Sequence, residues 1–537
     1  AADRFHGGDL QAAIADLSQP MDWTWWYTRY VVPGTIQEVP LYSFVKGELH
    51  GHTLSTAYVL FAAALAYAYY RTPKEARLRR GVILLAGLGG VGGVFGFMNT
   101  WALPSAGGLA VLAVAAADPH PATLLPAAVA DRLQPWRDRP TDRARRVLDE
   151  LWRLVLASVV GALVILVGVV VASPFLVFGH VPTNDGLGFL PPRSPLGPFL
   201  VIYVAIIAIF ATYVALRSWP LLSRYNRRSL AAGGLGLLLA VLGTILLLDF
   251  AVLAITGPLL LGAWLLLRSG RGDFLLVLLV GGVGLWLSYE VVHARIPAIN
   301  QIRWNTAMKV SVQGWTLAAA GAGGVVAMIL SRGRERVSAS GGGETTDGSR
   351  DETGPWRSLG GPVARAVVVV ALVTSLVFPV MVVGVELGGD VAEGNYEPTL
   401  DGLDDLEQWR PAQAEALDWL RDRQGTPTIV EAPGPSYQFT SSASVFTGLP
   451  TVIGWDHQAE YRSPADYDRR VEHVDRIYTA NWETAVTYLE QYDVRYVYVS
   501  ENERERYDEI RSFDQPGLSV AFENDAVTVF AVDQSAL

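Results

Sequence analysis

Apolar runs separated by short polar loops dominate the first 386 residues of the chain. A helix rises about 1.5 Å per residue and the hydrocarbon core of a bilayer is about 30 Å thick, so runs near this length predict membrane helices. The pattern predicts a polytopic α-helical membrane protein of about ten transmembrane helices. The predicted spans lie at roughly 52–70, 81–98, 101–117, 154–178, 197–215, 230–248, 251–267, 274–289, 310–330 and 363–385.

After residue 386 the pattern changes to short β-branched runs that alternate with amphipathic stretches. Alternating strands and helices favour a soluble α/β domain attached to the membrane part. The predicted strands lie within 427–433, 449–455, 494–500 and 526–532, and the predicted helices at 411–423 and 482–492.

These patterns divide the chain into three parts. Residues 1–50 form a loop region whose opening, AADRFHGGDL, is expected to be a fragment cut within a loop. Residues 51–386 form the transmembrane domain, in which a Gly/Ser/Thr-rich linker at about 331–361 is expected to be disordered. Residues 387–537 form the acidic α/β domain.

Arginine gathers in alternate connections between the predicted spans, and basic short loops stay in the cytoplasm. The basic loops are 71–80, 131–146, 217–228, 268–272 and 331–336. We therefore expect a multi-pass cell-membrane protein whose C-terminal domain is extracytoplasmic. The other parts expected on that side are 1–50, 99–100, 179–196 and 290–309.

Charge is distributed unevenly along the chain, whose formal net charge is −10. Residues 387–537 carry 29 Asp and Glu against 11 Arg, a net charge of −18. Such an acidic, lysine-poor surface suits a high-salt medium, which predicts a halophilic archaeon as the source and argues against nucleic acid as a partner. The sequence contains no cysteine, so disulfides and thiolate metal sites are excluded.

The stretch AGLGGVGGVFG contains the dinucleotide-binding pattern GxGxxG at Gly87, Gly89 and Gly92. It lies inside a predicted span with no preceding strand, so it lacks the context that nucleotide binding needs. Glycines at four-residue spacing, Gly89 with Gly93 and Gly92 with Gly96, instead predict close packing against another helix.

The stretch SFVKGELHGHTL places Glu48, His50 and His52 directly before the first predicted span. All three project to one face of an extended segment, whereas only Glu48 and His52 align in a helix. Such a cluster can bind a divalent metal ion, orient a phosphate or accept a proton, so these residues are the predicted catalytic and metal-binding group. A polar boundary that anchors the helix at the headgroups is the alternative.

Two further polar clusters are expected on the same side of the membrane. The turn NTWALP is expected to bind a ligand through Asn99 and Trp101, or Asn99 simply caps a helix. Loop 290–309 carries cations where the charge rule disfavours them, which suggests binding of a phosphate headgroup. Pairing with the acidic domain is the alternative. The ligand-binding candidates of this loop are His293, Arg295, Arg303, Asn305 and Lys309.

In the soluble domain, the stretch FTGLPTVIGWDHQAEYR holds Trp455, His457 and Glu460 just after a predicted strand. The aromatic ring could stack on a sugar or on membrane lipid. The alternative is an ordinary halophilic surface.

Several stretches together resemble the archaeal and chloroflexal YYY family of polytopic membrane proteins. They are PGTIQEVPLYSFVKGELHGH, NTWALP, RWNTAMKVSVQGW, FTGLPTVIGWDHQAEYR and VRYVYVSENERERY. The family pattern Gly-Asp-Leu-His-Pro-His is altered here, because Glu48 replaces the acid and Gly51 replaces the proline. The upstream part of the family, with its first membrane segments, is expected to be missing from this sequence.

The layout is also similar to that of GT-C membrane glycosyltransferases. This resemblance implies a polyprenyl-phosphate sugar donor, a glycan or protein acceptor, contact with membrane lipid, and an acidic residue in an extracytoplasmic loop. A glycosyltransferase is therefore the leading hypothesis. The alternatives are a transporter or flippase, and a noncatalytic cell-envelope assembly protein.

Overall fold

The computed structural model of the protein consists of two compact units. We call Ala1–His180, Asp185–Arg295 and Ile299–Gly384 the helical unit, and Val181–Asn184, Ile296–Ala298 and Val385–Leu537 the C-terminal unit. The structure describes residues 27–45, 49–133, 143–179, 186–296, 302–339, 361–388 and 401–537 apart from 437, together with 394, 397 and 399.

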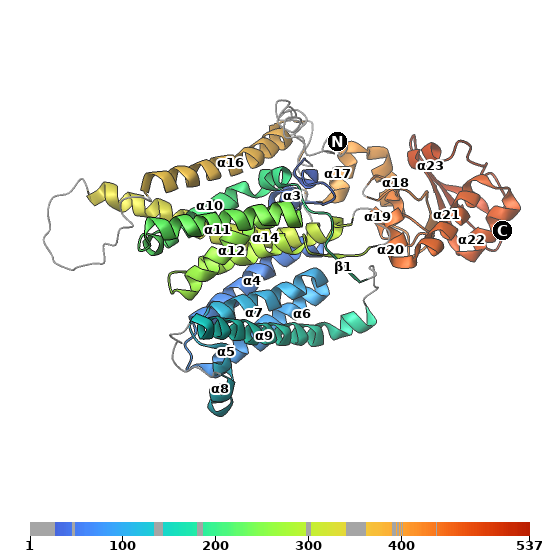
Figure 1. Ribbon diagram of the computed structural model, residues 1–537. Coiled ribbons are helices and arrows are strands. Elements are labelled where there is room, and N and C mark those ends of the chain that lie inside the picture. The colour runs from blue at the N-terminus through green and yellow to red at the C-terminus, as the bar shows by residue number, and fades with distance from the viewer. Residues whose placement is uncertain are drawn as a thin grey trace. The chain divides into compact units, whose positions relative to one another are not determined.

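Most helices of the helical unit run in nearly the same direction (Figure 1). The longer ones are α4 (Gly51–Arg71), α6 (Gly89–Met98), α7 (Leu103–Ala116), α9 (Arg143–Phe178), α10 (Leu196–Leu222), α11 (Arg227–Leu248), α12 (Ala251–Arg268), α13 (Phe274–Ser288), α14 (Trp304–Ala339) and α16 (Gly361–Gly388). The shorter elements are α2 (Tyr27–Tyr30), α3 (Pro40–Val45), α5 (Arg77–Val82), η3 (Ile83–Leu88), η4 (Thr100–Ala102), η5 (Pro121–Leu124), α8 (Ala127–Leu133), β1 (Leu187–Phe189) and β2 (Val292–Ala294).

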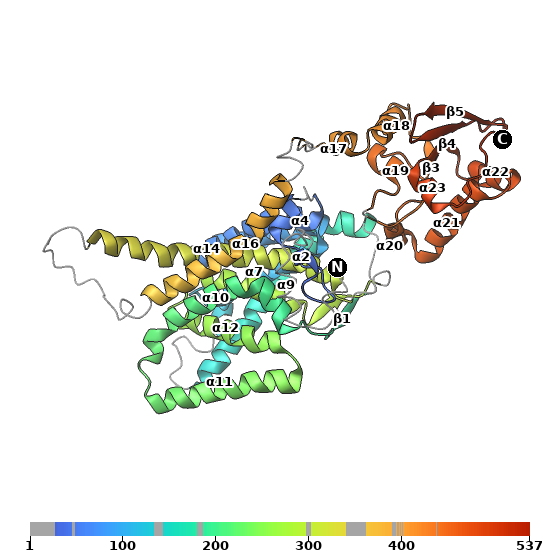
Figure 2. The same ribbon diagram turned by 90° about the horizontal axis from the view of Figure 1, so that it is seen from above.

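In the described part of the chain, 8 helices are long and apolar enough to cross a membrane. Two shorter apolar helices, Thr100–Ala116 and Phe274–Ser288, match the remaining predicted spans. The prediction of a polytopic helical membrane protein is thus confirmed. α11 lies along one edge of the helical unit (Figure 2), and none of its residues is buried, as expected for a helix that faces lipid.

Several helices extend beyond the predicted spans, as α10 does by continuing to Leu222. α9 begins at Arg143 rather than near 154, and α14 continues to Ala339, into the segment predicted to be a disordered linker. A hydropathy window stops at the last apolar residue, whereas a helix continues through charged residues of good helix propensity. The remainder of that linker lies outside the described residues.

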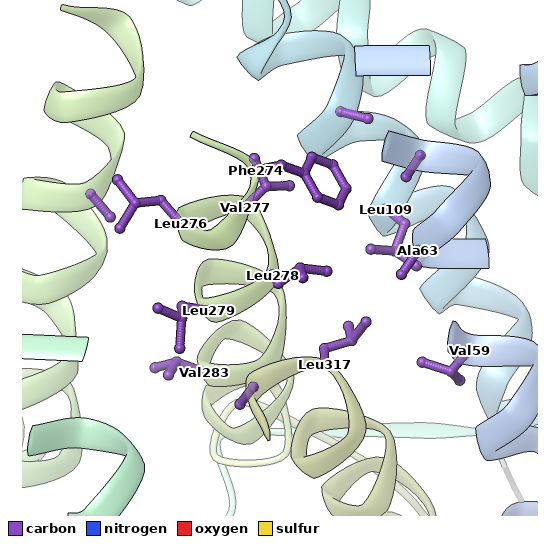
Figure 3. Packing of buried hydrophobic residues seen from close by; sticks show 14 of the residues in the cluster. Val59, Ala63, Leu109, Phe274, Leu276, Val277, Leu278, Leu279, Val283 and Leu317 are labelled. Atoms are coloured by element: carbon purple, nitrogen blue, oxygen red, sulfur yellow. The ribbon is translucent and has the colours of Figure 1, made fainter. Parts of the chain in front are cut away.

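The hydrophobic core of the helical unit lies where α13 meets α14, α4 and α7. Figure 3 shows Leu278 of α13 and Leu317 of α14 pointing into the space beside Val59, Ala63 and Leu109. These side chains are nearly all buried. The unit therefore has an apolar interior of its own in addition to any face that meets lipid.

The glycine-rich stretch packs α6 against α9, as the sequence predicts. A Cβ atom added at Gly89 would lie 2.6 Å from the side chain of Val167, and one at Gly93 or Gly96 would overlap Val171 or Ala172. The glycines therefore allow the two helix backbones to approach closely.

Loops of the helical unit gather at two ends. At the first, which we call the β1–β2 end, β1 pairs antiparallel with β2 and Asn99 contacts Ser55. At the second, the Arg80 guanidinium contacts Thr123 and Arg268 contacts Glu150. This separation agrees with the alternation of the basic loops, whereas the compartment that each end faces stays a prediction.

The C-terminal unit contains a mixed sheet of order β3-β4-β6-β5, in which β3 runs parallel to β4 and the other pairs are antiparallel. Three predicted strands are present, but 449–455 forms only an isolated bridge between Thr451 and Ile429. The sequence did not predict β5, an edge strand that is largely exposed and therefore weakly patterned. The elements are α17 (Gly402–Trp409), α18 (Pro411–Arg421), β3 (Thr428–Val430), α19 (Ser442–Thr447), η6 (Asp456–Gln458), α20 (Ala459–Arg462), α21 (Pro464–Thr479), α22 (Trp482–Gln491), β4 (Val494–Val499), α23 (Glu501–Arg506), β5 (Leu518–Glu523) and β6 (Thr528–Val532).

Candidate functional site

Glu38 is a fully buried carboxylate at the β1–β2 end of the helical unit. Arg29 Nη2 lies 3.3 Å from Glu38 Oε2, and His52 Nε2 lies 3.9 Å from Glu38 Oε1. The hydroxyl of Ser43 donates a hydrogen bond of 2.7 Å to Oε1. A guanidinium, an imidazole and a hydroxyl thus surround a carboxylate that would be costly to bury alone.

The segment that carries Glu38 is held in place from both sides. Pro40 begins α3, a position where the fixed φ of proline favours a helix, and α3 brings Ser43 back toward Glu38. The main-chain N–H of Glu38 donates to Ser311 Oγ of α14 at 3.2 Å, and the N–H of Gln37 donates to the carbonyl of Arg29 at 2.8 Å. The carboxylate position is therefore fixed by main-chain as well as side-chain contacts.

A second buried carboxylate, Glu290, lies at the same end. Arg303 Nη1 is 2.9 Å from Glu290 Oε1, and both side chains are almost fully buried. The main-chain N–H of Ser194 donates to Glu290 Oε2 at 2.9 Å, and Arg303 Nη1 also donates to Ser194 Oγ at 3.1 Å. This cluster ties loop 290–309 to the segment that precedes α10.

A chain of hydrogen bonds joins the segments of the two carboxylates. Gln37, next to Glu38, accepts a hydrogen bond from the hydroxyl of Tyr203. That hydroxyl lies 3.4 Å from the hydroxyl of Tyr289, which precedes Glu290. The ring of Trp286 packs against Tyr203 at a centroid distance of 4.1 Å, so this polar network adjoins the hydrophobic core.

Several buried polar atoms at this end have no hydrogen-bond partner. They are Glu38 Oε2, His52 Nε2, Thr53 Oγ1, Asn305 Oδ1 and Trp315 Nε1. Buried polar groups are normally satisfied by the protein or by ordered water. Two of these atoms, Glu38 Oε2 and His52 Nε2, belong to the carboxylate cluster, in which Arg29 and His52 approach Glu38 at ion-pair distance.

The structure brings one of the predicted catalytic residues to this carboxylate. His52 is buried beside Glu38, whereas His50 is exposed and its ring lies 5.7 Å from that of His52. Glu48 lies outside the described residues. The acid and imidazole pair that the sequence predicts thus has a described counterpart in Glu38 and His52.

The predicted ligand-binding residues Asn99 and Trp101 adjoin the start of α4. The side-chain amide of Asn99 is buried and donates to Ser55 Oγ at 3.4 Å. Its main-chain N–H donates to the carbonyl of Phe95 at 2.8 Å and caps the end of α6. Trp101 is half-buried against the hydrophobic core. Asn99 therefore caps a helix through its main chain, whereas its side chain lies in the interior.

Loop 290–309 distributes its predicted ligands between the interior and the surface. His293 is buried in β2, where burial and the nearby charge of Arg295 lower its pKa, so the neutral imidazole is favoured. Arg295 is exposed and Lys309 is half-buried. Arg303 is already paired with Glu290.

The predicted site residues of the soluble domain belong to the C-terminal unit. Trp455 is half-buried, and its ring N–H donates to the carbonyl of Thr440 at 2.7 Å. The main-chain N–H of His457 donates to Ser436 Oγ at 3.0 Å. The side chain of Glu460 lies outside the described residues. Ligand binding by this stretch stays a prediction.

A divalent metal ion at Glu48, His50 and His52 also stays a prediction. In the part of the chain that the structure describes, no group of at least 3 His, Asp or Glu side chains is placed to hold a metal ion. At Glu38 the guanidinium of Arg29 already supplies positive charge, so Glu38 and His52 alone do not fit a divalent cation.

Glu38 and Arg29 are not among the residues that the sequence predicts for the site. A signal was available, because Glu38 is the only charged residue between Arg29 and Lys46 and it lies close to a predicted span. An isolated acid in an uncharged stretch beside the membrane is expected to be buried and paired. The alternation of Glu48, His50 and His52 is a more visible pattern, although only His52 enters the described cluster.

Comparison with known proteins gives a family but no activity. The family model described as "Uncharacterized membrane protein (DUF2298)" matches residues 4–318. This range contains Glu38, His52, Glu290 and Arg303, but not the C-terminal unit from Val385 onward. No curated protein and no solved structure matches the chain.

Proposed function

Because the chain belongs to the family of uncharacterized membrane proteins DUF2298, we propose its activity from the chemistry of the site: a membrane glycosyltransferase of the GT-C type. The enzyme would take a sugar from a polyprenyl-phosphate donor at the extracytoplasmic face and pass it to a glycan or protein acceptor. The observation that carries this proposal is the buried carboxylate of Glu38 with the imidazole of His52 and the guanidinium of Arg29 at ion-pair distance.

In this proposal Glu38 is the catalytic base. The acceptor hydroxyl attacks the anomeric carbon of the donor sugar while Glu38 accepts the hydroxyl proton. The bond between that carbon and the phosphate oxygen breaks, and its electron pair leaves with the lipid phosphate. His52, 3.9 Å from Glu38, is placed to orient the carboxylate and to pass the proton on.

Negative charge develops on the departing phosphate, so cations near it would stabilise the transition state. Arg295 is exposed and Lys309 is half-buried, and both belong to the loop predicted to meet the donor. In this proposal Arg303 instead positions loop 290–309, because its charge is compensated by Glu290 at 2.9 Å.

The distribution of charged residues along the chain gives less support to the alternative functions. A transporter or flippase needs ionisable groups at mid-membrane depth, and the predicted spans 154–178, 197–215 and 230–248 contain none. A noncatalytic envelope assembly protein is favoured by one observation, since the ion pairs at Glu38 and Glu290 would also serve a purely structural purpose.

Substituting Glu38→Gln tests the proposal, because it removes the carboxylate and nearly preserves its shape. We expect transfer of labelled sugar from membrane lipid to glycan to fall at least ~100-fold, the scale of general-base catalysis. Transfer is measured with the full chain in native membranes. Glu150→Gln is the matched control, because Glu150 pairs with Arg268 at 2.8 Å at the opposite end and should leave transfer unchanged.

Two outcomes would count against this assignment. Wild-type transfer by a folded Glu38→Gln variant, together with an inactive Glu48→Gln variant, would move the base to Glu48. If neither wild type nor control transfers sugar, and Glu38→Gln only lowers the melting temperature, the noncatalytic alternative is supported.

A further inference from the structure

A pocket in the C-terminal unit lies between strands β4 and β6 and the segment that follows α23. Its volume is about 320 Å³, and Val499, Phe513 and Phe530 supply apolar and aromatic walls. This volume is at the lower limit for small-molecule sites, so the pocket suits a single ring better than an extended chain.

Arg511 lines this pocket and lacks the partners that a guanidinium normally has. Its Nε and Nη1 atoms are shut off from solvent without a hydrogen-bond acceptor. The guanidinium carbon lies 4.7 Å from the ring centroid of Trp482, which holds the side chain in place. Burial lowers the pKa of Arg511, as expected for a desolvated charge.

Arg511 differs from the arginines of this acidic unit that pair with carboxylates, as Arg410 does with Glu501 at 3.0 Å and Arg506 with Asp475 at 3.0 Å. It also differs from Arg423 and Arg504, whose guanidinium groups donate hydrogen bonds to the main-chain carbonyls of Trp419 and Ala526. Among the described ion pairs, none includes Arg511. An unpaired guanidinium in a pocket, in a region with a net charge of −18, is best explained by an acceptor that comes from a ligand.

We propose that this pocket binds a six-membered sugar ring that carries a carboxylate. The carboxylate would accept hydrogen bonds from Arg511, whose planar fork matches its two oxygens. The side chains of Asp508 and Thr528, which also line the pocket, would bond the ring hydroxyls. The aromatic walls would cover the apolar face of the ring.

The composition of the pocket separates this ligand from simpler ones. A phosphate would meet Asp508 as well as the cations Arg504 and Arg511, and it has no apolar face to cover the aromatic walls of the pocket. An apolar acid of the same size would leave Asp508 and Thr528 without new partners. A neutral sugar would leave Arg511 unpaired. The inference does not depend on sugar transfer at Glu38, since all its residues belong to the C-terminal unit.

Titration calorimetry of the purified full chain tests the proposal. The probe is glucuronate, and the comparison ligands are glucose, cyclohexanecarboxylate and inorganic phosphate. We expect saturable binding of glucuronate with a dissociation constant at least tenfold lower than that of each comparison ligand. Arg511→Met should weaken glucuronate binding at least tenfold, and Arg511→Lys should give a smaller loss because it keeps the charge without the fork.

Arg423→Met is the matched control, because Arg423 lies 4.1 Å over the ring of Trp419 and is outside the pocket. It should bind glucuronate as the wild type does. Equal affinity for glucose or phosphate would overturn the proposed ligand class. Unchanged glucuronate binding by a folded Arg511→Met or Arg511→Lys variant, or no saturation up to about 10 mM, would overturn the site itself.

Discussion

The two units bury glutamates in different ways. In the helical unit each buried carboxylate faces a guanidinium, Glu38 with Arg29 at 3.3 Å and Glu290 with Arg303 at 2.9 Å. In each case an opposite charge compensates for the water that the buried carboxylate has lost.

The C-terminal unit instead uses main-chain dipoles. Glu431 accepts a hydrogen bond of 2.9 Å from the N–H of Ala443, and Glu503 accepts one of 2.7 Å from the N–H of Ala432. No described ion pair includes either glutamate, and burial raises the pKa of Glu431 to about 8. Without a counter-ion, burial therefore favours the neutral form of the Glu431 carboxyl at pH 7.

Cysteine labelling should give the largest effect, because sites at the two ends of the helical unit should react from opposite sides of the membrane. It would also show whether the β1–β2 end, which holds Glu38 and Glu290, and the C-terminal unit lie in the same compartment. The sequence has no native cysteine, so the background is low. We expect Leu190→Cys and Val520→Cys to react with an impermeant maleimide in intact cells, and Tyr225→Cys only after permeabilisation. Reaction of position 520 only after permeabilisation would refute the extracytoplasmic placement of the C-terminal unit.

Arg303→Met should destabilise the helical unit by about 3–5 kcal/mol, because it leaves Glu290 buried without a counter-ion. The melting temperature of the detergent-solubilised full chain measures this loss. The double variant Arg303→Met/Glu290→Gln should recover much of it. A folded single variant of wild-type stability that has lost transfer would instead support the phosphate-binding role that the sequence predicts for Arg303.

Glu431→Gln should change how stability depends on pH. The ordinary pKa of Glu431 is 4.5 and its folded value is about 8, so the folded unit favours the neutral acid. Its contribution is fully present below about 4.5 and is lost as pH rises through about 8. The thermal transition of the C-terminal unit should therefore fall over this range in the wild type and less in Glu431→Gln. Exposed Glu490→Gln should retain the wild-type slope.

Lowering the salt concentration should have the smallest effect, and mainly on the C-terminal unit. The Debye length grows from about 3 Å at 1 M to about 30 Å at 0.01 M, so repulsion within a region of net charge −18 is then less screened. We expect far-UV circular dichroism to show partial loss of structure at low salt. Identical spectra and melting temperatures at both concentrations would contradict the halophilic interpretation.

Elements that are set by the local pattern of apolar residues could be predicted from the sequence. Features that depend on contacts with distant parts of the chain could not. The apolar stretch around Leu278 and the glycine contact at Gly93 follow from local pattern. The ends of α9 and α14 do not, because their outer turns are charged.

For the site, the sequence indicates His52 and the cations of loop 290–309. It does not indicate that Arg303 meets Glu290, because that pairing joins two segments across a loop. Glu38 likewise can be recognised as a site residue only from its contacts with Arg29 and Ser311. Arg29 lies 9 residues before Glu38 in the chain, and Ser311 lies 273 residues after it. Long-range pairing of this kind has no local pattern that a single sequence reveals.

The short length of α13 explains why the acidic residues at both of its ends are paired with arginines. A helix of 15 residues rises about 22 Å, some 8 Å less than the hydrocarbon thickness. A bilayer meets so short a span by thinning, or the groups at the ends of the helix come close to the hydrocarbon. Asp273 precedes the helix and pairs with Arg217 at 2.7 Å, and Glu290 follows it and pairs with Arg303. Each acid thus has a counter-ion at the position where a short helix brings charge toward the hydrocarbon.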